Sequence, residues 1–128
     1  MESTQPPSPP LLNEAIKQAL KDWQQEAPVD ACFAQLYLYR KLQRKSGSNA
    51  KLALNQLLLD SIRRLQETDE QAARFLHARY LDGLPMSRIE NQMNLAESTL
   101  YVLQREAIER LTTTLLTADA TTLHDQQA

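Results

Sequence analysis

The stretch from residue 69 to residue 111 constrains the fold most, because its apolar residues recur at helical spacing and are interrupted twice. The first interruption contains Gly83 and Pro85, and the second contains Asn94. Glycine and asparagine adopt the left-handed backbone conformation that ends a helix, and proline suits the first turn of a new one. The stretch therefore predicts a helix, a break, a short helix, a tight turn and a longer helix.

This order of elements is typical of a helix-turn-helix, whose two helices pack through apolar residues on either side of the turn. The residues predicted to form that buried side are Ile89, Met93, Leu95, Leu100, Leu103 or Gln104, and Ala107. The residues predicted to face outward near the start of the longer helix are Glu97, Ser98, Tyr101, Val102 and Arg105. In a helix-turn-helix, outward residues at this position meet the major groove of DNA.

A set of residues in the same stretch follows a pattern shared by one group of DNA-binding domains. They are Arg79, Tyr80, Gly83, Leu84, Ile89, Met93, Asn94, Leu95, Ser98, Thr99, Leu100, Ala107, Arg110 and Leu111. Their arrangement resembles region 4 of bacterial sigma factors and the related LuxR-like response-regulator domains. The resemblance implies a sigma region 4-like helix-turn-helix over residues 68–117, with a recognition helix from about Glu97.

Five residues depart from the family pattern, and two of them, Leu103 and Glu106, stand at positions that are often basic in the family. Pro85 stands where the family has Ser or Thr, and Glu90 stands where it has a small Ala between the two helices. Ala96 replaces the family's capping Ser, which costs about 1 kcal/mol of cap energy unless a neighbouring side chain compensates.

A second resemblance spans most of the chain and depends on the segments LLLDSIRRL, NLAESTLY and QREAIERL. These segments are similar to the N-terminal module of large bacterial STAND regulators, in which an NB-ARC-type or AAA-type ATPase domain follows. The resemblance implies that the chain is a fragment of a larger protein, and that the ATPase domain of this parent protein is a partner of the module.

The rest of the chain predicts three more helices and two irregular ends. Residues 1–10 are rich in Pro and Ser and predict a disordered tail. The segment 11–67 predicts a helix over 11–23, a second one capped by Asp30, and a third over 50–66. Thr68 and Gln71 form a predicted capping box for the fourth helix. The last helix is expected over 97–116, with 118–128 as a frayed end or linker.

The predicted fold is therefore all-α, with about six helices. An N-terminal layer of three helices is expected to pack on the C-terminal helix-turn-helix. With only two glycines in the chain, a largely helical fold is also favoured by composition.

Charge is distributed unevenly along the chain. Segment 68–111 has five arginines and seven acids, whereas 31–59 has five bases and no acid. These five bases are Arg40, Lys41, Arg44, Lys45 and Lys51. They are candidate auxiliary phosphate contacts, although cations at a helix C-terminus are also favoured by the helix dipole alone. Both interpretations remain open at the level of sequence.

Two functions follow from these observations. The first is a DNA-binding module of a bacterial transcription regulator, in which double-stranded DNA is contacted by Arg88, Glu97, Ser98, Thr99, Tyr101 and Arg105. Arg105 is the strongest candidate for base contact, but it could equally form a solvated pair with Glu109 or Tyr101. The second function is an acidic helix-turn-helix that acts as a protein–protein interaction or signalling module of a larger NTPase.

The composition argues against several other classes of function. His77, His124 and Cys32 have no partners at metal-ligand spacing, and two glycines cannot build a phosphate-binding loop. We therefore expect no enzyme activity, no cofactor and no metal. No apolar run approaches the roughly 20 residues of a membrane span, and the N-terminus lacks the features of a signal peptide. A cytoplasmic protein is expected, and whether it forms a homodimer stays open.

Overall fold

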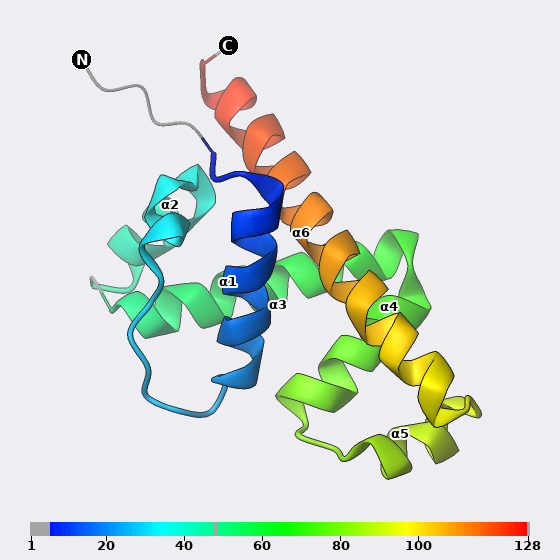
Figure 1. The fold of residues 1–128 in the computed structure, drawn as a ribbon. Coiled ribbons are helices and arrows are strands. Elements are labelled where there is room, and N and C mark those ends of the chain that lie inside the picture. Colours follow the sequence, from blue (N-terminus) through cyan, green and yellow to red (C-terminus); the bar gives the residue numbers. More distant parts are fainter. Residues whose placement is uncertain (1–5, 48, 128) are drawn as a thin grey trace.

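The computed structural model describes residues 6–47 and 49–127, and every regular element in these ranges is helical (Figure 1). The α-helices are α1 (Pro9–Lys21), α2 (Tyr37–Lys45), α3 (Ala50–Thr68), α4 (Glu70–Leu76), α5 (Met86–Met93) and α6 (Glu97–Gln127). A 3₁₀ turn, η1 (Ala31–Gln35), precedes α2, and a π-helical turn, η2 (His77–Leu81), follows α4. The prediction of an all-α fold of about six helices is confirmed. No helix in the described ranges is both long enough and apolar enough to cross a membrane.

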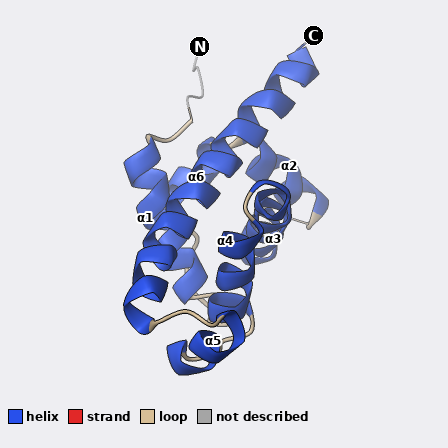
Figure 2. Cartoon of the chain, turned by 90° about the vertical axis from the view of Figure 1, so that its right-hand side faces the viewer, coloured by secondary structure: helices blue, strands red, loops and turns tan. Residues whose placement is uncertain are grey.

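One apolar core joins the helices, and α6 runs through the middle of the arrangement (Figure 2). The longest helix, α6, packs against all five other α-helices. The core contains Ile16 of α1, Leu58 of α3, Phe75 of α4 and Leu111 of α6, each fully buried. Residues from the N-terminal three helices and from the following segment therefore share a single interior.

The C-terminal part of α6 differs from the expectation for residues 118–128. Instead of a frayed end or linker after about residue 116, the helix continues to Gln127. Asp119 explains part of the difference, because it is only 5% exposed and its Oδ1 accepts the Leu38 backbone N–H at 2.8 Å. The N-cap residue of α2, Leu36, has no side chain that can accept this bond. The carboxylate of α6 therefore caps α2 from outside that helix.

The N-terminal boundaries also differ from the expected ones. Of the tail predicted over 1–10, residues 1–5 lie outside the described residues, but α1 already begins at Pro9. Two prolines in the first turn suit a helix start, because that turn has no intrahelical use for their missing N–H groups. The helix expected after Asp30 is split in two. Asp30 caps η1 through Cys32 N–H at 2.9 Å, and α2 begins only after the extended residue Leu36.

The predicted capping box at Thr68 is wrong. Thr68 is the last residue of α3, and its hydroxyl donates to the Leu65 carbonyl at 3.2 Å. The N-cap of α4 is Asp69, whose Oδ1 accepts the Ala72 backbone N–H at 3.1 Å. Because α3 extends two residues further than expected, the cap moves by one residue to the next side chain that can accept a hydrogen bond.

Candidate nucleic-acid interface

The helices α5 and α6 are joined by a tight turn whose geometry matches the prediction. Asn94 ends α5 in the left-handed conformation, with φ 55° and ψ 47°, and α6 begins at Glu97. The Leu95 backbone N–H closes the turn by donating to the Glu90 carbonyl at 3.3 Å. Upstream, Gly83 also has a positive φ of 70°, and Pro85 is the N-cap of α5 rather than its first residue. We call residues 86–107 the α5–α6 unit.

The buried side of the α5–α6 unit is formed by the expected residues. Ile89, Leu100 and Ala107 are fully buried, while Met93 and Leu95 are half-buried and pack against the core. Sequence alone left Leu103 and Gln104 as alternatives, and in the structure Leu103 is the buried one. This apolar seam fixes which face of α6 is turned away from the rest of the molecule.

The predicted DNA-contacting residues all lie on the exposed surface. They are Arg88 on α5, followed by Glu97, Ser98, Thr99, Tyr101 and Arg105 on α6. Ser98, Tyr101 and Arg105 share one face of α6, because residues three and four positions apart are neighbours on a helix. Tyr101 and Val102 are 50% and 43% exposed, which makes them two of the four large hydrophobic side chains exposed in the described ranges. The exposed surface of the first turns of α6 therefore combines polar side chains with these two large apolar ones.

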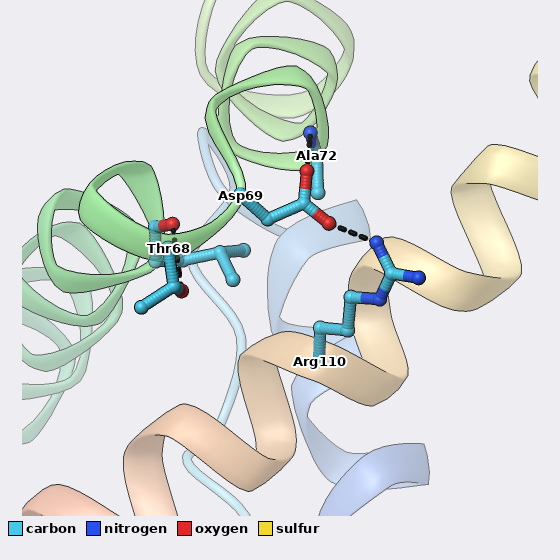
Figure 3. A network of polar contacts seen from close by, with 5 residues as sticks. Thr68, Asp69, Ala72 and Arg110 are labelled. Atoms are coloured by element: carbon cyan, nitrogen blue, oxygen red, sulfur yellow. Dashed lines mark hydrogen bonds and ion pairs between the residues drawn. The ribbon is translucent and has the colours of Figure 1, made fainter.

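Two of the five arginines in segment 68–111 are used inside the fold. Arg110 of α6 donates to Asp69 Oδ2, the second oxygen of the α4 cap (Figure 3). Arg79 donates to the Leu84 carbonyl at 3.2 Å, across the turn that contains Gly83. Both residues belong to the sigma-like pattern, and in this fold they hold the frame of the α5–α6 unit. Both guanidinium groups therefore have partners within the chain, although the Arg110 side chain remains 54% exposed.

The other three arginines remain on the surface. Arg74, Arg88 and Arg105 are exposed, and within the described part of the chain none of them forms an ion pair. The pair between Arg105 and Glu109 that the sequence allowed is therefore not formed. Sequence reasoning did not single out Arg74, although the buried neighbours Ala73 and Phe75 leave its position on the outer side of α4. These three arginines are the cations available to a ligand on this side of the molecule.

Exposed acids surround these cations. Glu97, Glu106 and Glu109 are exposed along α6, and Glu90 of α5 is partly exposed. Acids on the same surface repel DNA phosphates and lower the affinity that three arginines would otherwise provide. The α5–α6 unit itself contains two arginines, Arg88 and Arg105, and three acids, Glu90, Glu97 and Glu106, so its formal charge is −1.

Four of the five auxiliary basic residues lie on α2, which contacts α6 far from the start of that helix, and the fifth, Lys51, lies in the first turn of α3. Asp119 contacts the start of α2, and it lies 22 residues after Glu97, which is about 33 Å along the helix axis. Arg40 donates to the Ala34 carbonyl at 2.9 Å, and Lys51 donates to the Asp22 carbonyl at 2.8 Å. Arg44 and Lys45 are exposed at the end of α2, and Lys41 is partly exposed. The fold does not bring these five residues together with the α5–α6 unit.

Burial protects the titratable side chains of the core. Cys32 is buried, and burial together with its contact to Asp30 raises the pKa of its thiol to about 12. Burial also raises the pKa of Tyr39 and of Tyr80. The Cys32 thiol therefore stays protonated and unreactive in the folded protein at neutral pH.

Comparison of the chain with protein-family models, curated proteins and solved structures gave no match. The likeness to sigma region 4 thus depends on the residue pattern between Arg79 and Leu111 alone.

Proposed function

We propose that this chain is a DNA-binding module of a bacterial transcription regulator, and that the first turns of α6 enter the major groove of duplex DNA. One observation carries the proposal. Behind a left-handed turn at Asn94, a single exposed face of α6 presents Ser98, Tyr101 and Arg105, while the opposite face is buried. A helix held in this way can present three or four side chains to base edges.

The exposed side chains have chemistry suited to distinct contacts with DNA. Arg105 can donate two hydrogen bonds to the O6 and N7 acceptors of guanine, which is the commonest specific contact in the major groove. Glu97 can accept from the N4 amino group of cytosine, so an acid at this position is compatible with base contact. Arg88, near the start of α5, and the hydroxyls of Ser98 and Thr99 are suited to phosphates.

The expected affinity is modest, because few cations are available. If Arg74 and Arg88 each neutralise one phosphate while Arg105 contacts a base, the logarithm of the binding constant falls with a slope of about −1.8 against the logarithm of salt concentration. A fourfold increase in salt then weakens binding about 12-fold. This steep dependence distinguishes phosphate contacts from apolar association.

Fluorescence anisotropy with random-sequence duplex DNA at about 50 and 200 mM salt tests the proposal. We expect binding at low salt and a large loss at high salt. Arg105→Ala and Tyr101→Ala should remove the preference for a selected sequence, since both lie on the exposed face of α6. Equal losses on every DNA sequence would refute direct base contact, and no binding at either salt concentration would refute DNA binding by this chain.

A second candidate function is a protein-interaction module, with the parent ATPase domain or another protein as partner. The exposure of Tyr101 and Val102 beside Glu97 and Glu106 favours it, because an apolar centre with an acidic rim suits a basic protein surface. Charge reversal separates the two functions. Glu97→Lys and Glu106→Lys should strengthen binding to random-sequence DNA, because each removes an acid and adds a cation, but should weaken binding to a basic protein partner. Partner binding that survives both changes would count against this candidate.

A further inference from the structure

A surface pocket is lined by residues of α3, α4, η2 and α5, together with Asp82 just after η2. Its volume is about 300 Å³, which is at the lower limit of the roughly 300–1,000 Å³ typical of small-molecule sites. Ile62, Ala73 and Ala78 line it and are all buried, so they provide an apolar floor. The rest of the lining is polar and exposed, and it comes from each of the surrounding elements.

The polar lining is rich in hydrogen-bond donors. Arg74 of α4 is its free cation, and the amides of Gln66 on α3 and Gln92 on α5 add neutral donors. Among the lining residues, Asp82 is the one carboxylate, and its Oδ2 lies 3.2 Å from His77 Nδ1. Asp82 is thus in contact with a neighbouring ring, and Arg74 forms no ion pair within the described residues.

The backbone beside the pocket is unusual. Residues 77–81 form a π-helical turn, in which the Asp82 backbone N–H donates to the His77 carbonyl at 2.9 Å. Single π-helical turns inside helices occur frequently at functional sites, because they redirect the side chains around them. Here the turn carries His77 and leads to Asp82, and both line the pocket.

We propose that this pocket binds a small molecule through a carboxylate or phosphate group, and that the bound ligand regulates the α5–α6 unit. The planar guanidinium of Arg74 suits two-point binding of either oxyanion, and Gln66 and Gln92 would hold the same group from two other helices. A ligand in this position connects α5 to α3 and α4. The regulatory part of this inference depends on the proposed DNA binding, whereas the ligand site itself does not.

Thermal denaturation of the full chain tests the ligand site without DNA. Sodium phosphate and sodium succinate serve as the two probes, and sodium chloride at matched ionic strength is the control. We expect at least one probe to raise the Tm saturably, by about 5 °C at a tenfold excess over its Kd. Which probe is effective distinguishes a phosphate ligand from a carboxylate one. If neither probe raises the Tm more than chloride does, the oxyanion site is refuted.

Two arginine variants show whether the rise in Tm comes from binding at this pocket. Arg74→Gln should abolish the shift, whereas Arg64→Gln, which removes an exposed arginine of α3 outside the pocket, should retain it. Equal shifts in both variants would overturn the assignment to this pocket.

The regulatory part is tested by anisotropy with duplex DNA, with and without the effective probe at matched ionic strength. Coupling between two sites is reciprocal, so a probe that changes DNA affinity must itself bind differently to the DNA complex. Gln92→Ala should abolish this coupling while Asn91→Ala, its exposed neighbour on α5, should not. A DNA affinity that the bound probe leaves unchanged would refute regulation but not the site. Absence of all DNA binding would instead refute the proposed function and regulation, leaving the Tm result unaffected.

Discussion

Asp69 joins the start of α4 to the side of α6, so its replacement tests how the α5–α6 unit is held to the rest of the molecule. One carboxylate oxygen accepts the Ala72 backbone N–H at 3.1 Å, and the other accepts from Arg110 (Figure 3). The Asp69 side chain is 19% exposed and that of Arg110 is 54% exposed. The first contact is a helix cap, and the second is an ion pair partly screened by solvent.

The helix cap and the ion pair contribute different amounts to the free energy of unfolding, and two substitutions of Asp69 separate them. Loss of a helix N-cap costs about 1 kcal/mol, and a half-exposed ion pair contributes about 0.5 kcal/mol. Asp69→Ala removes both, so we expect the free energy of unfolding to fall by about 1.5 kcal/mol. Asp69→Asn keeps an oxygen for the cap, since Asn and Asp cap equally well, and should cost about 0.5 kcal/mol. For a chain of this length the corresponding losses in Tm are about 6 °C and 2 °C.

Urea denaturation followed by circular dichroism measures these differences, and a double-mutant cycle isolates the ion pair. Arg110→Met should cost about as much as Asp69→Asn, and the double variant should cost little more than either alone. Arg105→Met is the matched control, because Arg105 is exposed on the same helix and forms no ion pair within the described residues. If the two Asp69 variants are equally unstable, the cap contributes nothing. If the double variant shows simple additivity, the ion pair contributes nothing.

Four further predictions concern Asp119, Cys32 and Lys41. Asp119→Ala should lower the free energy of unfolding by about 1–3 kcal/mol, because it leaves the buried Leu38 N–H without an acceptor. Asp125→Ala, on the exposed end of α6, is the control and should have no effect. Chemical denaturation of both variants measures the difference. The Cys32 thiol should react with a thiol reagent only after unfolding, and a native protein that reacts as fast as the denatured one would contradict its burial. The raised pKa of the Cys32 thiol contributes stability that is fully present below pH 9 and should be lost as pH rises toward about 12. The reason is that the thiol of the unfolded chain releases its proton at lower pH than the thiol of the folded chain. Denaturation at a series of pH values, compared between the protein and Cys32→Ala, measures this loss. Lys41→Ala should leave DNA affinity unchanged in the anisotropy assay, because α2 contacts α6 about 33 Å from the first residue of α6. A loss of affinity equal to that of Arg105→Ala would show that the DNA contact surface extends to α2.

Local patterns in the sequence determined most of the secondary structure. Asn94 and Gly83 were placed correctly because few residues adopt a positive φ at low cost, so their positions mark helix ends. The buried and exposed faces of α5 and α6 also followed from spacing alone, since the period of a helix fixes which residues share a face. The outward position of Tyr101 and Arg105 needed no knowledge of the tertiary structure.

Only the tertiary structure decided which charged groups are free. Nothing in the sequence shows that Arg110 meets Asp69, 41 residues earlier, or that Lys51 reaches the Asp22 carbonyl. The same holds for the length of α6, because the carboxylate of Asp119 is held by a backbone N–H 81 residues away. A side chain's hydrogen-bond partners depend on how helices pack, and packing brings together residues whose separation along the chain carries no periodic signal. The charge available to a ligand is for this reason a property of the fold.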